Sequence, residues 1–177
     1  APALSLDKLN LSVQSPPWKR LLKSHQISLS ALPSSGTSAP IQLHASLYGN
    51  DVSKPANWYG QLELSIKNVD LMAYQAWLDY RLLSPSVALK NGRGDIKLAM
   101  AFENQQWHSI SSTLALSDLQ LDLPAQNTGL IMRSLSGELA WAKTDTDETY
   151  SAKRLSVQSN LGLSLHDATL HYLKSKS

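Results

Sequence analysis

The 177-residue sequence predicts a mainly β protein, a long curved antiparallel sheet with one helix near residues 70–83. Two observations lead to this fold class. Apolar and polar residues alternate with a period of two over much of the chain, and in three places the alternation slips by one residue beside an aspartate. The apolar residues are mostly aliphatic, with 32 Leu against one Phe. No linker-like composition divides the chain, so we treat residues 1–177 as one segment.

Strict alternation marks four runs, at residues 41–47, 61–67, 96–102 and 135–141. Successive side chains of a strand point to opposite faces, so each run has one apolar face and one mostly polar face. This pattern is typical of an antiparallel sheet with one side in water.

The three slips occur in "LSLDKLNLSV" (4–13), "LALSDLQLDL" (114–123) and "LGLSLHDATLHY" (161–172). A one-residue slip would turn every later side chain to the wrong face unless a β-bulge absorbs it. We therefore predict a bulged strand that recurs along the chain and bends while keeping one apolar face.

The exception to the β pattern is "DLMAYQAWLDYRLL" (70–83). Asp70 is a suitable N-cap, the apolar residues that follow have helical spacing, and Pro85 would end the helix. "PPWKRLLK" (16–23) is either a short basic amphipathic turn that touches a membrane or, as we favour, a connector that packs its Trp and Leu residues. Turn-forming composition predicts loops at 32–40, 49–57, 124–128 and 143–148.

Residues 93–95 spell Arg-Gly-Asp, a tripeptide that adhesion loops present to receptors. The alternative is the start of a strand, since Asn91-Gly92 is a strong turn dipeptide and Gly94 adds a second permissive backbone position. We favour the strand start, with Arg93 and Asp95 on the polar face.

No catalytic or metal-binding pattern emerges from the residue types. His166 and His171 fall on opposite faces of a strand, and "KTDTDETY" (143–150) lacks the Gly and Glu of a calcium loop. There is no cysteine, and a formal charge of +2 is too small to indicate nucleic acid. No run approaches 18 consecutive apolar residues, so no transmembrane helix is expected. We expect a protein that is not an enzyme and uses no cofactor, metal or nucleic acid.

The area of the predicted apolar face raises the question of what covers it. A strand of ~10 residues is roughly 33 Å long, whereas a helix of ~14 residues is about 21 Å long. One helix therefore cannot cover about nine strands. Either the sheet folds into a closed sandwich, or it forms an open hydrophobic groove that binds something apolar, such as long acyl chains.

Three stretches carry a family likeness: Ala39–Leu78, with "NWYGQLELSIKNVDL"; Leu89–Leu123, with "NGRGDIKLAMAF"; and Leu135–Val157. Their order and spacing resemble the AsmA-like superfamily, which includes AsmA, TamB and YhdP, and most closely an internal segment of the YhdP group. The likeness covers about residues 39–157. That family often has a Trp where Met100 or Phe102 stands here.

The resemblance implies an internal segment of a large envelope protein of a Gram-negative bacterium, anchored in the inner membrane and extending through the periplasm as a β groove. Such proteins are implicated in phospholipid movement toward the outer membrane and support its barrier. The implied partners are phospholipid, neighbouring repeats of the same chain and other envelope proteins. The alternative function is a closed β-sandwich that acts as an interaction or spacer module.

If the groove forms, its floor is expected to come from the alternating apolar positions, which are also those that a closed core would use. The predicted lipid-binding residues are Leu62, Leu64, Ile66, Leu98, Met100, Phe102, Leu114, Leu116, Leu139 and Trp141.

Overall fold

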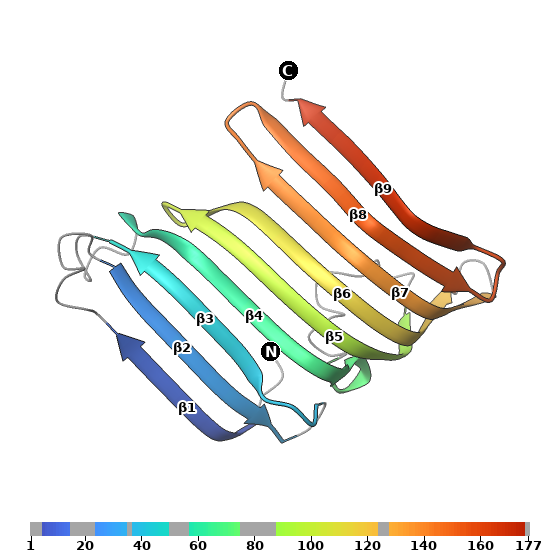
Figure 1. Ribbon diagram of the computed structural model, residues 1–177, viewed down its shortest axis with the longest axis horizontal. Coiled ribbons are helices and arrows are strands. Elements are labelled where there is room, and N and C mark those ends of the chain that lie inside the picture. The colour runs from blue at the N-terminus through green and yellow to red at the C-terminus, as the bar shows by residue number, and fades with distance from the viewer. Residues whose placement is uncertain are drawn as a thin grey trace.

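A computed structural model describes residues 5–14, 24–34, 37–49, 57–74, 88–123 and 128–175. Nine strands form one open antiparallel sheet, and their order in the sheet is their order in the chain, so β1 and β9 are the edges (Figure 1). The strands are β1 (Leu6–Gln14), β2 (Ser24–Pro33), β3 (Ile41–Tyr48), β4 (Tyr59–Asp70), β5 (Ala88–Glu103), β6 (Gln106–Leu123), β7 (Thr128–Lys143), β8 (Asp147–Ser159) and β9 (Ser164–Ser175). This confirms the all-β antiparallel prediction.

The helix prediction is not confirmed. The described part of 70–83 is η3 (Leu71–Tyr74), a single turn of 3-10 helix, and no α-helix lies within the described residues. Asp70 does cap this turn, because its Oδ1 accepts a hydrogen bond from the N–H of Met72 at 3.0 Å. Residues 75–83 and the connector predicted at 16–23 lie outside the described residues.

The pairing register gathers the apolar side chains on one face of the sheet, because directly paired residues of neighbouring strands point to the same side. We call this the apolar face. One row of cross-strand partners runs from β2 to β9 through Ile27, Ala45, Leu62, Met100, Ile110, Trp141, Tyr150 and Tyr172. The next row runs through Leu29, Leu43, Leu64, Leu98, Ser112, Leu139, Ala152 and Leu170.

Bulges keep this face continuous where the alternation slips. The three predicted slips each contain a non-glycine residue with positive φ, and β4 and β8 contain two more of the same kind. These residues, with φ between 49° and 53°, are Lys8, Asn68, Asp118, Arg154 and Asp167. Around each of them, two residues of the bulged strand oppose one of a neighbour. The extra residue adopts the left-handed conformation, so the next apolar side chain returns to the same face.

Arg93-Gly94-Asp95 lies inside β5 and pairs with strands on both sides, β4 and β6. It is therefore not at the tip of a loop. The predicted turn at Asn91-Gly92 is wrong, because β5 begins at Ala88 and includes both residues. Arg93 and Asp95 are exposed, and Asp95 Oδ1 accepts a hydrogen bond from the bulge N–H of Asn68 at 2.8 Å.

Gly94 is required by the close approach of two strands. Its φ is +149°, and a Cβ at this position would lie 2.0 Å from the carbonyl oxygen of Ala115. An L side chain here would force β5 and β6 apart as well as straining the backbone. Backbone geometry at the bulge therefore explains the glycine of the tripeptide.

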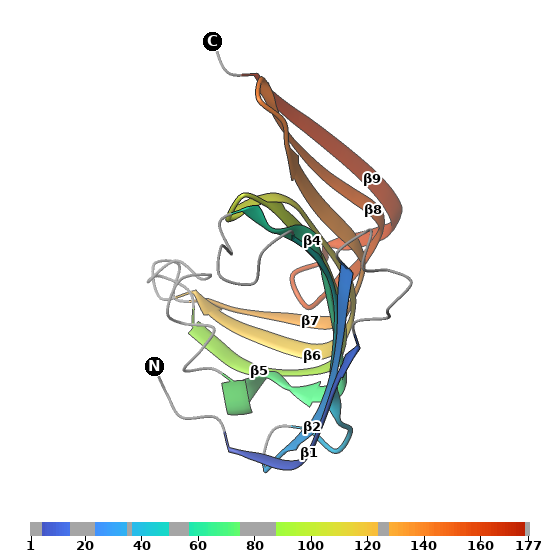
Figure 2. The ribbon, with the colours of Figure 1, turned by 90° about the vertical axis from the view of Figure 1, so that its left-hand side faces the viewer.

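Burial is concentrated at one end of the strands. Val69, Leu71, Leu89, Leu116 and Leu119 form a buried cluster at the rim where β4 and β6 end and where η3 lies. We call this the η3 rim. The central strands bend toward the side on which η3 sits (Figure 2). Because Leu71 of η3 belongs to the cluster, that side is the apolar face.

We predict that Gly94→Ala lowers the free energy of unfolding by about 2–3 kcal/mol, because it combines backbone strain with a clash against β6. Gly129→Ala is the matched control, since nothing lies within 4 Å of the added methyl group. It should change stability by no more than about 0.5 kcal/mol. Urea denaturation of both variants checks this, and equal stabilities would contradict the role given to the bulge.

Candidate functional site

The apolar face is the candidate site, and the register brings all ten predicted floor residues onto it. Leu116 alone of the ten is buried, at 9% exposed, because it belongs to the buried cluster. Leu139 is 40% exposed, and the other eight are half-buried. The set therefore shares one face but does not form a closed core.

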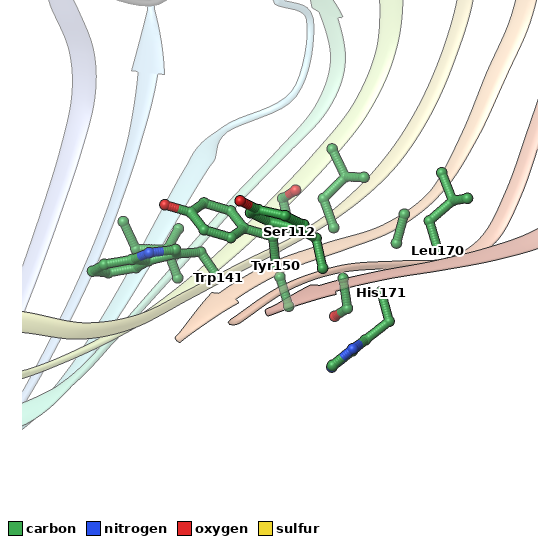
Figure 3. Close-up of a pocket in the computed structure, with 11 residues that line it drawn as sticks. Ser112, Trp141, Tyr150, Leu170 and His171 are labelled. Carbon is green, nitrogen blue, oxygen red and sulfur yellow. The ribbon is translucent and has the colours of Figure 1, made fainter. Parts of the chain in front are cut away.

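A hollow on this face lies over β6 to β9 and has a volume of about 580 Å³, in the range of small-molecule sites. Its residues on the apolar face are Ile110, Ser112, Leu139, Trp141, Tyr150, Ala152, Leu170 and Tyr172. Figure 3 shows the labelled Trp141, Tyr150 and Leu170 on one side of the sheet, whereas His171 points to the other. None of the lining side chains is an Asp, Glu, Lys or Arg.

Leu139 and Trp141 of the hollow were predicted from sequence, whereas Tyr150 and Tyr172 were not. Tyr172 lies in the third slipped run, so the alternation placed it on an apolar face. The alternation did not indicate that Tyr172 would pair with Tyr150 of β8. Tyr150 follows a polar loop and has no alternation of its own. Only the pairing of Trp141 with Tyr150, and of Tyr150 with Tyr172, joins these rings into one surface.

The apolar face continues toward both edges of the sheet. On β1, Leu11 and Val13 are each 60% exposed, and on β9, Leu170 is 59% exposed. The described residues form a single sheet, and no second sheet among them covers these side chains. The closed β-sandwich considered as the alternative architecture is therefore not what these residues form.

The opposite face is polar. A hollow of about 440 Å³ on it is lined by charged and polar side chains that include Glu63, Lys67 and Lys97. The described residues include exposed ion pairs such as Lys90–Asp122 (3.9 Å) and Arg154–Glu138 on this side. Exposed pairs of this kind contribute little to stability. They keep this side of the sheet compatible with water.

The described residues hold no group of three or more His, Asp or Glu placed to bind a metal ion. Burial raises the pKa of Tyr74 in η3, which keeps its phenol neutral and suits a packing role. Neither observation supplies an acid–base or metal site on the apolar face.

Comparison of the chain with protein-family models, with curated proteins and with solved structures found no match. Within the described residues, no helix is long and apolar enough to cross a membrane.

Two leucines of the apolar face are expected to differ sharply in their contribution to stability. Leu116→Ala removes a buried side chain from the cluster and should cost about 2–4 kcal/mol. Leu139→Ala removes one that is 40% exposed and should cost about 1 kcal/mol or less. Chemical denaturation of both variants checks this, and similar losses would mean that Leu139 is covered.

Proposed function

We propose that this chain is a non-enzymatic lipid-binding segment whose apolar face shields phospholipid acyl chains from water. One observation carries the proposal: a continuous apolar face spans nine strands, and most of its side chains remain partly exposed. Exposed apolar surfaces of this extent are uncommon on monomeric proteins and mark binding sites.

The energy available is sufficient for acyl chains. Burying a methylene group contributes about 0.8 kcal/mol, so burying only about six of them on the apolar face would contribute roughly 5 kcal/mol. No Asp, Glu, Lys or Arg lines the hollow over β6 to β9. The phosphate would remain in water, and binding would depend on the chains rather than on headgroup type.

The wider setting of the proposal comes from the likeness of residues 39–157 to the AsmA-like superfamily. On that interpretation the segment belongs to an inner-membrane-anchored protein in the periplasm and takes part in phospholipid transport between the inner and outer membranes. The two edges of the sheet agree with this setting. Within the described residues no strand pairs with the outer side of β1 or β9, so neighbouring repeats of the same chain could continue the sheet there.

The test is native mass spectrometry of the purified chain, followed by organic extraction and lipid analysis. We expect phospholipid at near-stoichiometric level. Leu98→Asp and Met100→Asp should each reduce it at least about fivefold, because each places a charge where a chain would lie. Ala99→Asp is the matched control, since Ala99 lies between them and faces the other side of the sheet. It should retain the lipid.

Circular dichroism must show that all three variants remain folded. A lipid-free mass for the unmodified chain, together with no uptake from labelled liposomes, would contradict the proposal. The segment would then act as a spacer or docking module.

A further inference from the structure

Aromatic side chains gather at one rim of the sheet, where β3, β5, β7 and β9 end (upper left in Figure 1). The chain has one Phe, five Trp and six Tyr, and nine of these residues lie in the described part. Tyr74 belongs to η3 at the opposite rim. The remaining eight form what we call the aromatic rim: Tyr48, Trp58, Tyr59, Phe102, Trp107, Trp141, Tyr150 and Tyr172.

Ring contacts hold the aromatic rim in place. Tyr48 and Tyr59 stack with their centroids 5.1 Å apart. Phe102 and Trp107 meet edge to face at 5.8 Å, across the two-residue turn between β5 and β6. Tyr150 and Tyr172 meet at 5.9 Å. Cross-strand aromatic pairs of this kind stabilise a sheet, so the rings are fixed at the strand ends.

The same rings remain exposed to solvent. Tyr59 is 51% exposed, Trp107 44%, Tyr150 40% and Tyr172 61%. Pairing alone therefore does not account for them. Trp and Tyr combine an apolar ring with a polar group, and they concentrate where a bilayer meets water.

The two rims close the apolar face differently. At the η3 rim, Leu71 packs into the buried cluster with Val69 and Leu116. At the aromatic rim, the hollow over β6 to β9 is bordered by Trp141, Tyr150 and Tyr172 and is open. Over β4 to β6, an acyl chain would therefore meet a packed cluster at the η3 rim, whereas over β6 to β9 it would meet open apolar surface at the aromatic rim.

The charges beside the aromatic rim indicate which type of lipid surface would fit. The described charged residues of its strand ends and turns are Glu103, Lys143, Asp145, Asp147, Glu148 and Lys174, four acids against two lysines. Among the described residues the rim thus has no excess of basic side chains that would attract anionic headgroups. Its exposed rings therefore carry the contact, and a zwitterionic bilayer suffices for them.

We propose that the aromatic rim docks on the surface of a zwitterionic phospholipid bilayer and is the end through which acyl chains reach the apolar face. The second part of this inference, that acyl chains reach the apolar face through the aromatic rim, rests on the proposed function. Docking would place the rings at headgroup level, with the open hollow directed toward the chains of the bilayer.

The test is flotation of the purified chain with phosphatidylcholine vesicles. The chain should float with them. In a Trp107→Ser/Tyr172→Ser double variant, the fraction of protein that floats should fall at least about fivefold. The matched control is Leu161→Ser/Leu163→Ser, which removes similarly exposed apolar side chains (55% and 49%) from the connection between β8 and β9 at the η3 rim. The control should float as the unmodified chain does. Adding phosphatidylglycerol to the vesicles should not strengthen binding.

Three outcomes would overturn docking: no flotation of the unmodified chain, equal loss in both double variants, or binding that requires phosphatidylglycerol. A concentration-dependent dimer that the rim variant abolishes, without flotation, would instead assign the rim to a second copy of the chain. Flotation by a chain that neither co-purifies with lipid nor takes it up would support docking and overturn the proposed function alone. Circular dichroism of both double variants excludes unfolding as the cause of a loss.

Discussion

The structure depends on a constraint of register: nine strands must keep their apolar side chains on the same face although β1, β4, β6, β8 and β9 each contain an extra residue in the left-handed conformation. In a strand, one added residue reverses the face of everything that follows. Each bulge prevents this by placing one residue, such as Asp118 or Asp167, in the left-handed conformation. The polar residues at these positions accept that conformation at modest cost, and Gly94 provides the close approach that one bulge needs.

Once the register holds, the sheet has more apolar surface than it covers. The buried cluster under η3 closes the η3 rim over β4 to β6, and its members are the largest group of packed apolar residues in the described chain. Beyond it the same face becomes progressively exposed, toward Leu139 and the edge strands. One part of the apolar face, packed under η3, thus stabilises the fold. The other part, toward the aromatic rim, stays exposed and is the part proposed to bind lipid.

Period-two alternation was sufficient to predict the strands at 41–47, 61–67, 96–102 and 135–141, and the slips were sufficient to predict three bulges. Predictions from the local sequence failed where pairing with neighbouring strands determined the backbone conformation. Asn91-Gly92 has turn chemistry, but β4 and β6 hold the chain beside it extended, and Gly92 lets Leu71 and Leu119 approach. The aromatic rim was not foreseeable, because Trp141, Tyr150 and Tyr172 meet only through the register of three strands.

The central claim is that acyl chains lie on one face of the sheet, and a photo-crosslinking scan of β5 tests it most directly. Benzoylphenylalanine would replace each residue from 96 to 101 in turn, and lipid adducts would be measured after irradiation with bound phospholipid. Because side chains alternate between faces, the account predicts adducts at 96, 98 and 100 and none at 97, 99 and 101. Adducts at every position, or only at the odd-numbered ones, would contradict it.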